Sequence, residues 1–117
     1  MKIRIKGNSV RLRLTKSEVD KIALGQSVKE IVEFPENELT YKISFANHSV
    51  VSFRDGFIHI EIEKSGLSKW ASSTEVGIDF TSGKIKVLVE KDFACLITRD
   101  GEDDADAFPN PLASDAG

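Results

Sequence analysis

Apolar and polar residues alternate along the first fourteen positions of the chain, on both sides of Gly7-Asn8. A period of two is typical of a strand with one buried face. A two-residue loop with glycine in first place favours a type II′ turn. We therefore expect a β-hairpin whose apolar face points to the core. That face carries Met1, Ile3, Ile5, Val10, Leu12 and Leu14.

The rest of the pattern predicts two short helices and further strands. Thr15 and Glu18 form a capping box, and Gly25 is placed to end the helix that follows them. A second helix is expected over residues 65–73, with Trp70 as its anchor in the core. Alternating segments between turn signals predict strands over 28–34, 39–45, 50–54, 57–63, 76–80 and 84–89, and an extension over 93–97.

These elements predict an α+β fold: a largely antiparallel, twisted sheet of seven or eight strands, curled toward a half-open barrel, with two short helices closing one end. A chain of 117 residues with 40% hydrophobic content suits one compact domain. We assign residues 1–99 to that domain and residues 100–117 to an acidic tail that is partly docked on it. No internal repeat is evident.

The sequence carries no signal for export or for crossing a membrane. The single cysteine cannot form an internal disulfide, and the first residues lack the apolar stretch and cleavage site of a signal peptide. No apolar run approaches the ~20 residues of a membrane span. A cytoplasmic location without a membrane partner is therefore expected.

Charge is sorted along the chain, although the net charge is only −3. Residues 1–16 hold six cations and no acid, whereas residues 100–117 hold six acids and no base. The acidic tail also contains Phe108 and Leu112, which bracket two prolines. Because a free tail has little use for large apolar side chains, we expect this part of the tail to dock on the domain.

The polar face of the N-terminal hairpin is a candidate anion-binding surface. In the expected register Arg4 faces Arg11, which is unfavourable by about 0.2–1 kcal/mol unless an anion or a carboxylate lies over the pair. The favoured covering group comes from the same chain: the acidic tail, or Glu18 and Asp20. The candidate anion-binding residues are Arg4, Lys6, Arg11 and Arg13. The tail contacts are expected from Asp100, Glu102, Asp104, Asp106 and Phe108.

An external polyanion, such as nucleic acid or a nucleotide, is the less favoured ligand of the same surface. Arginine side chains match the geometry of phosphate oxygens. The hairpin, however, contains no aromatic residue on which a base could stack.

The acids at every second position over residues 100–106 have the spacing of oxygen ligands in a calcium loop. Ala105 stands where an EF-hand needs glycine, and Pro111 stands where it needs a bidentate glutamate. No metal and no other cofactor is therefore expected.

No residue belongs to a recognisable catalytic motif. Cys95 lies among apolar residues without a nearby histidine, which favours a buried, inert thiol. His48 is in a turn and His59 is on a strand, and neither has a sequence neighbour that would make a zinc site or a triad. The chain is therefore expected not to be an enzyme.

Two strings of residues give the chain a family resemblance. IKGNSVRLRLTKSEV spans Ile5 to Val19, while LVEKDFACL begins at Leu88 and EDDADAFPNP ends at Pro111. The chain resembles an uncharacterised family of small bacterial proteins, a domain of unknown function in which these strings occur together. The resemblance implies no activity, cofactor or catalytic residue.

These observations favour a non-enzymatic protein-interaction domain whose acidic C-terminal segment packs on its basic N-terminal hairpin. Its partner is an unidentified protein or a second copy of the chain, bound through an exposed strand edge. The alternative is an anion-binding module that uses the basic hairpin for nucleic acid or a nucleotide.

Overall fold

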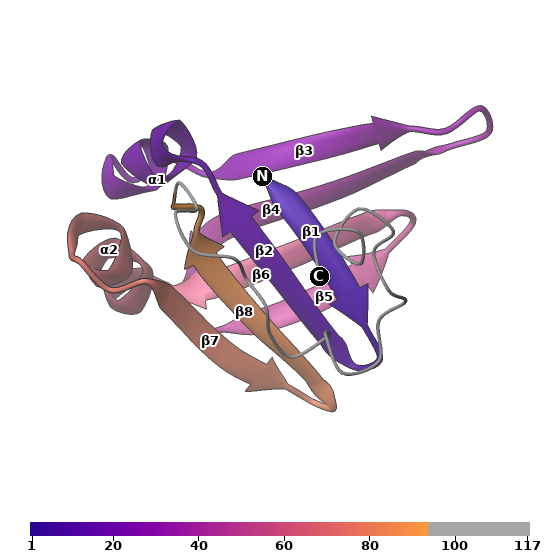
Figure 1. The fold of residues 1–117 in the computed structure, drawn as a ribbon. Helices are drawn as coiled ribbons and strands as arrows, with labels where there is room; N and C mark the ends of the chain where they lie inside the picture. Colours follow the sequence, from indigo (N-terminus) through magenta and orange to yellow (C-terminus); the bar gives the residue numbers. More distant parts are fainter. Residues whose placement is uncertain (94–117) are drawn as a thin grey trace, which may run out of the picture.

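The structure is a computed structural model that describes residues 1–93, which form eight strands and two helices (Figure 1). The tail over residues 100–117, and residues 94–97 of the expected last strand, lie outside this range. The elements are β1 (Lys2–Lys6), β2 (Ser9–Leu14), α1 (Lys16–Ala23), β3 (Val28–Glu33), β4 (Glu38–Ala46), β5 (Val50–Arg54), β6 (Phe57–Glu63), α2 (Lys64–Ser72), β7 (Gly77–Ser82) and β8 (Ile85–Lys91).

The strands form two four-stranded sheets: the A sheet, in the order β1-β2-β8-β7, and the B sheet, in the order β3-β4-β6-β5. The α+β class, the strand number and the two short helices of the prediction are confirmed. The strands are divided between two sheets instead of forming one, however, and those described close no barrel. Each sheet joins two antiparallel hairpins through a parallel central pair, β2 with β8 or β4 with β6.

The parallel pairs bring distant parts of the chain together in the core. β2 and β8 pair from Ser9↔Lys86 to Leu14↔Lys91, so an early and a late strand form the centre of the A sheet. Leu12 and Val89 are paired there, and both are fully buried. Parallel strands require a crossover connection, which here runs through the entire B sheet.

Both helices lie at one end of the two sheets, which we call the helix end, and the four hairpin turns lie at the opposite hairpin end (Figure 1). The predicted anchor Trp70 is fully buried. Its Nε1 donates to the carbonyl oxygen of Val76 at 3.2 Å, and the Nζ of Lys91 lies 5.4 Å from the ring centre. The helices thus close the core at the helix end.

The two halves of the described chain share one topology, although no internal repeat is evident in the sequence. β1-β2-α1-β3-β4 and β5-β6-α2-β7-β8 are each a hairpin, a helix and a second hairpin. Exchanging the halves converts the order of the A sheet into that of the B sheet. In each half the second strand of the first hairpin runs directly into the N-cap of a helix, at Thr15 or Glu63.

The sequences of the two halves are similar only over a short stretch. TKSEVDKIA, which begins at Thr15, and EKSGLSKWA, which begins at Glu63, share two lysines, a serine and an alanine at matching positions. The strands share their alternation but few residue types. Because alternation is common to all half-buried strands, it does not reveal that two particular hairpins correspond.

The residues at the hairpin turns fit the turns that they make. Gly7 has φ of +54°, as the predicted type II′ turn requires, and both Asp55 and Gly56 have positive φ, as a type I′ turn requires. The carbonyl oxygen of Gly56 also accepts from the backbone N–H of Thr40 at 2.9 Å. A Cβ on Gly56 would lie 2.6 Å from the carbonyl oxygen of Glu38. The turn between β5 and β6 therefore packs tightly against β4.

Gly56→Ala is expected to destabilise the fold more than Gly83→Ala. Positive φ, 76° and 61° at the two sites, raises the energy of an L residue by roughly 1–2 kcal/mol. A Cβ at Gly83 meets nothing within 4 Å, whereas a Cβ at Gly56 must displace backbone. Urea unfolding of both variants measures the difference in the free energy of unfolding. Equal losses would contradict the tight packing of this turn.

Candidate anion-binding face

The β1–β2 hairpin carries five cations on the surface that faces away from the core. Its register pairs Lys2 with Arg13 and Arg4 with Arg11, as the sequence predicts. Side chains alternate across a strand, so these residues lie opposite the buried Val10 and Leu12. The structure therefore brings all four predicted residues together and adds a fifth. We call this set the basic face: Lys2, Arg4, Lys6, Arg11 and Arg13.

Two shallow hollows lie over the basic face and the neighbouring strand. The first, of roughly 240 Å³, is lined by Lys2, Ile3, Arg4, Arg11 and Arg13. The second, also of roughly 240 Å³, is lined by Ser9, Val10, Arg11, Lys86 and Leu88. Both are smaller than the ~300–1,000 Å³ of a typical small-molecule site. The surface therefore suits single carboxylate or phosphate groups better than an enclosed ligand.

Glu90 on β8 brings a carboxylate to the basic face. Its Oε1 lies 3.4 Å from the Nε of Arg11 and 3.7 Å from the Nε of Arg13. This oxygen is buried and makes no hydrogen bond with the residues described, so its attraction to the two guanidinium groups is Coulombic. Sequence reasoning missed Glu90 because its position depends on the parallel register that pairs it with Arg13.

Glu18 and Asp20 have other partners, so the expectation that they cover the basic face is wrong. Glu18 accepts from the α-ammonium group of Met1 at 2.8 Å and from the backbone N–H of Thr15 at 2.9 Å. Asp20 accepts from the Nζ of Lys16 at 3.2 Å. The predicted capping box is confirmed, because the side chain of Thr15 also accepts from the backbone N–H of Glu18.

An ammonium clamp holds the start of β1, the strand that carries three cations of the basic face. The α-ammonium of Met1 donates to Glu18 and, at 3.0 Å, to Glu30, while the hydroxyl of Tyr41 donates to the carbonyl oxygen of Met1. Burial by itself lowers the pKa of this ammonium, but hydrogen bonds and the two negative charges outweigh burial and raise the pKa above 8.0. Burial also favours a higher pKa for Glu18, but the bonds from Met1 and Thr15 outweigh it and hold that pKa below 4.5.

The corresponding hairpin of the second half carries much less of this charge. Arg54 matches Lys6, immediately before the two-residue turn. A larger hollow, of roughly 470 Å³, lies over this hairpin, and Phe57 is part of its lining. The duplicated scaffold therefore does not require the basic face. The positions of Lys2, Arg4, Arg11 and Arg13 are taken by Val50, Ser52, His59 and Glu61.

A serine, a histidine and a glutamate lie in sequence across this second face. The Oγ of Ser44 is 2.7 Å from the Nε2 of His59, whose Nδ1 is 4.0 Å from the Oε1 of Glu61. The first distance suits a nucleophile and its base, but the second is too long for the hydrogen bond that orients a base. The histidine and the glutamate also lie on a central strand, whose backbone amides pair with β4 and β5 and are not preorganised for an oxyanion. We therefore assign no catalytic role to this group.

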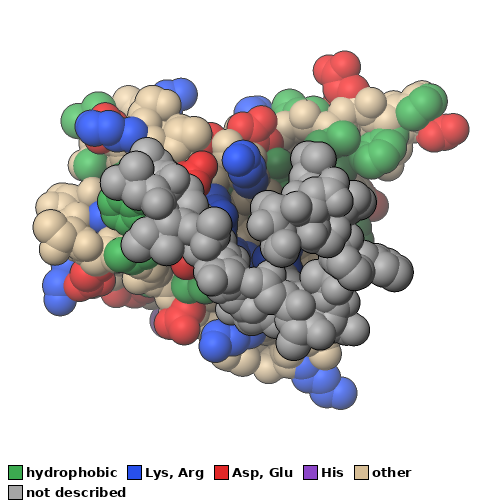
Figure 2. All heavy atoms as spheres, viewed as in Figure 1, with side chains coloured by type: hydrophobic (Ala, Val, Ile, Leu, Met, Phe, Trp, Pro, Cys, Tyr) green, Lys and Arg blue, Asp and Glu red, His purple; other side chains and the backbone are tan. Residues whose placement is uncertain are grey.

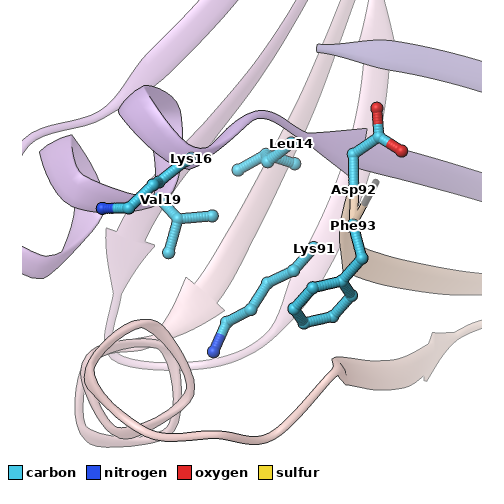
Figure 3. A pocket seen from close by; sticks show the side chains of 6 residues that line it. All are labelled: Leu14, Lys16, Val19, Lys91, Asp92 and Phe93. Atoms are coloured by element: carbon cyan, nitrogen blue, oxygen red, sulfur yellow. The ribbon is translucent and has the colours of Figure 1, made fainter. Parts of the chain in front are cut away.

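A hollow of roughly 370 Å³ lies at the helix end, beside the last described residue (Figure 3). Its two lysines are engaged elsewhere, because Lys91 donates to the carbonyl oxygen of Ser73 at 2.6 Å and Lys16 pairs with Asp20. Its charged groups are thus not directed at a common ligand. It is lined by Leu14, Val19 and Phe93, which are apolar, and by Lys16, Lys91 and Asp92.

Among the other residues considered in the sequence, His48 is exposed in the loop between β4 and β5. Within residues 1–93, no three His, Cys, Asp or Glu side chains are grouped to hold a metal ion, and neither helix is long and apolar enough to cross a membrane. The structure does not describe Cys95, Asp100, Glu102, Asp104, Asp106 and Phe108.

The fold and the basic face together define a two-sheet α+β domain with a duplicated topology and one basic hairpin. The chain belongs to a family of unknown function, DUF7009, whose model matches residues 1–112. This confirms the resemblance to an uncharacterised domain family. Comparisons with curated proteins and with solved structures found no match. The matched range includes both the basic face and the acidic residues up to Leu112.

Glu18→Gln tests the ammonium clamp through its pH dependence. Glutamine can still cap α1 but carries no charge, and about 1 kcal/mol of the free energy of unfolding should be lost near pH 7. The ammonium has a raised pKa, so its contribution is present below pH 8.0 and is lost as pH rises through that pKa. Glu18 has a lowered pKa, so its contribution is present above pH 4.5 and is lost as pH falls through that pKa.

Urea unfolding of the wild type and Glu18→Gln from acid to alkaline pH should therefore show the largest difference between these two limits. Glu30→Gln is the matched comparison, because the side chain of Glu30 is 42% exposed and that of Glu18 only 16%. Its effect should be smaller. A difference that does not change with pH would contradict an ionic clamp.

Glu90→Gln tests the charge balance of the basic face. The substitution keeps the side-chain shape but leaves Arg11 and Arg13 without this carboxylate, and we expect a loss of about 1 kcal/mol at low salt that narrows at high salt. The control is Glu75→Gln, since Glu75 pairs with Lys69 at 3.9 Å on an exposed surface. Urea unfolding at two salt concentrations measures both. An unchanged stability of Glu90→Gln would show that other groups balance the two arginines.

Proposed function

We propose that this chain is a protein-interaction domain whose basic face binds an acidic polypeptide segment, and that residues 100–106 of the same chain are the resident ligand. The observation that carries this proposal is the basic face itself. Five cations lie on one hairpin, although the corresponding hairpin of the same scaffold folds with one arginine in their place. Charge that the fold does not require points to a ligand.

Charge complementarity favours an acidic ligand that has several carboxylates. Glu90 contributes one carboxylate, beside Arg11 and Arg13 on the inner strand of the hairpin. Three further cations stand on β1, at the edge of the A sheet. Residues 100–106 contain five carboxylates and no cation, so this segment matches the basic face in both sign and number of charges.

The spacing of the charges supports the same ligand. Side chains two residues apart in an extended chain lie on one side of it, about 6.6 Å apart. The cations Lys2, Arg4 and Lys6 follow this period along β1, and the acids from Asp100 to Asp106 follow it too. An extended acidic segment beside the strand can therefore match successive carboxylates with successive cations. Each such pair contributes roughly 0.2–1 kcal/mol.

An external phosphate ligand is the second candidate for the same surface. Three arginines line the first hollow, and arginine forms bidentate contacts with phosphate oxygens. In that case the acidic segment competes with the phosphate for the same cations. Neutralisation of the segment should lower stability if the segment is the ligand. It should tighten the binding of an external phosphate ligand if the segment only competes with that ligand.

The full-length variant Glu102→Gln/Asp104→Asn/Asp106→Asn tests the proposal. It removes three negative charges from the segment and should lower the melting temperature at low salt, by about 4–8 °C for each kcal/mol of lost attraction. High salt should narrow the difference, because it screens the charges in the wild type. The matched control, Glu33→Gln/Glu36→Gln/Glu38→Gln, removes three charges from the β3–β4 hairpin and should show no such salt dependence.

Equal melting temperatures for the wild type and the tail variant would rule out the segment as the ligand. Titration of both proteins with a single-stranded oligonucleotide tests the second candidate whatever the melting temperatures show. Binding whose affinity falls as salt is raised would support an external polyanion, and tighter binding by the tail variant would show that the segment competes with it.

A further inference from the structure

Large apolar side chains lie exposed at the hairpin end, on the core-facing side of both sheets. Ile5 is 59% exposed and Phe53 is 67% exposed. The register nevertheless pairs them with Val10 and Ile58, which are buried core residues. Directly paired residues share one face of a sheet, so Ile5 and Phe53 point to the inside of the fold without being covered by residues 1–93.

The two ends of the sheets differ in this respect. At the helix end, Leu14 and Ile62 are almost completely buried, and the helices supply Ile22, Leu67 and Trp70 to the same core. At the hairpin end, the two sheets diverge in Figure 1, and no described helix lies there. Ile5 and Phe53 also hold matching positions in the two halves, one residue before the last of their strands. Equivalent positions in the two halves are thus both left exposed.

Further exposed apolar side chains lie on the β3–β4 hairpin, at the opposite edge of the B sheet from β5. Val32 is core-facing by register and 38% exposed, and Phe34 at the turn is 55% exposed. Figure 2 shows hydrophobic side chains in green along this protruding hairpin, with acidic side chains in red beside them. We call Ile5, Val32 and Phe53 the apolar hairpin end.

We propose that the segment Phe108-Pro109-Asn110-Pro111-Leu112 of the same chain covers the apolar hairpin end. This proposal rests on the proposed function, since the acidic residues that precede the segment are the ligand of the basic face. An acidic run on the outside of the A sheet and an apolar run at its end would form one continuous strap over the domain.

The length of chain beyond the described residues fits this path. β8 runs parallel to β2 and ends at the helix end, where Phe93 is the last described residue. The fifteen residues from there to Phe108 span up to about 50 Å when extended. The distance along a strand of six residues is only about 20 Å. The acids over residues 100–106 fall between the two points, so the chain passes the basic face before it reaches the hairpin end.

The chemistry of the segment fits the surface. Phe108 and Leu112 supply apolar area of the kind that Ile5 and Phe53 leave uncovered. Two prolines restrict the backbone between them and reduce the entropy lost on docking. A proline has no N–H to satisfy, so the segment places fewer unpaired donors against an apolar surface.

A double-mutant cycle in the full chain tests this contact, with Phe108→Ala, Phe53→Ala and the combination of both. Phe108→Ala should lower the melting temperature by about 4 °C in the wild type and should have almost no effect in the Phe53→Ala background, because the two side chains stabilise the fold together. Phe57→Ala is the matched control. Phe57 lies on the opposite side of the same hairpin, so its effect and that of Phe108→Ala should add.

An unchanged melting temperature in Phe108→Ala, or effects of Phe108→Ala and Phe53→Ala that add, would overturn the proposal. Sedimentation at several concentrations tests whether a second copy of the chain supplies the segment instead. In that case the coupling between Phe108 and Phe53 would depend on concentration and a dimer would be present. The cycle leaves every charge in place. Coupling without any effect of the neutralised acids would therefore support the apolar contact and reject the electrostatic one, and the reverse result would do the opposite.

Discussion

The parallel pairing of β2 with β8 is the constraint on which the rest of the structure depends. It joins residues 9–14 to residues 86–91 and buries the centre of the A sheet. The same register sets Glu90 between Arg11 and Arg13. It also fixes the direction in which the chain leaves β8, toward the helix end and beside the basic face. Core formation, the charge balance of the two arginines and the direction in which β8 ends thus have one origin.

The two halves share the features that the fold requires and differ in the residues on their outer surface. Both halves keep a two-residue turn, a run of buried residues and an N-cap at the end of the second strand. On the outer surface the halves differ, because one hairpin carries the basic face and the other carries Ser52, His59 and Glu61. Like charges facing each other across a hairpin are unfavourable. Facing cations occur on the β1–β2 hairpin and not on its counterpart β5–β6, so the shared fold does not require them.

The features that the sequence predicted are those decided by neighbouring residues. The first hairpin and its register, the type II′ turn at Gly7-Asn8, the capping box at Thr15 and the burial of Trp70 each depend on a few adjacent positions. The clustering of the predicted basic residues followed from that local register. The division into two sheets, the partner of Glu18 and the position of Glu90 depend on residues far apart in the chain. Alternation determines which side of a strand is buried, but it contains no information on which strand lies beside it.

A ligand that belongs to the same chain, as proposed for residues 100–106, would also constrain any external partner. A tethered segment acts at an effective concentration that reaches the millimolar range for short flexible connections. If residues 100–106 occupy the basic face, a free peptide with equal affinity for that face cannot displace them at micromolar concentration. A successful competitor needs more carboxylates, phosphates in their place, or additional contacts at the apolar hairpin end. The tethered segment would therefore keep weakly binding anions off the basic face, whose cations would otherwise attract many of them.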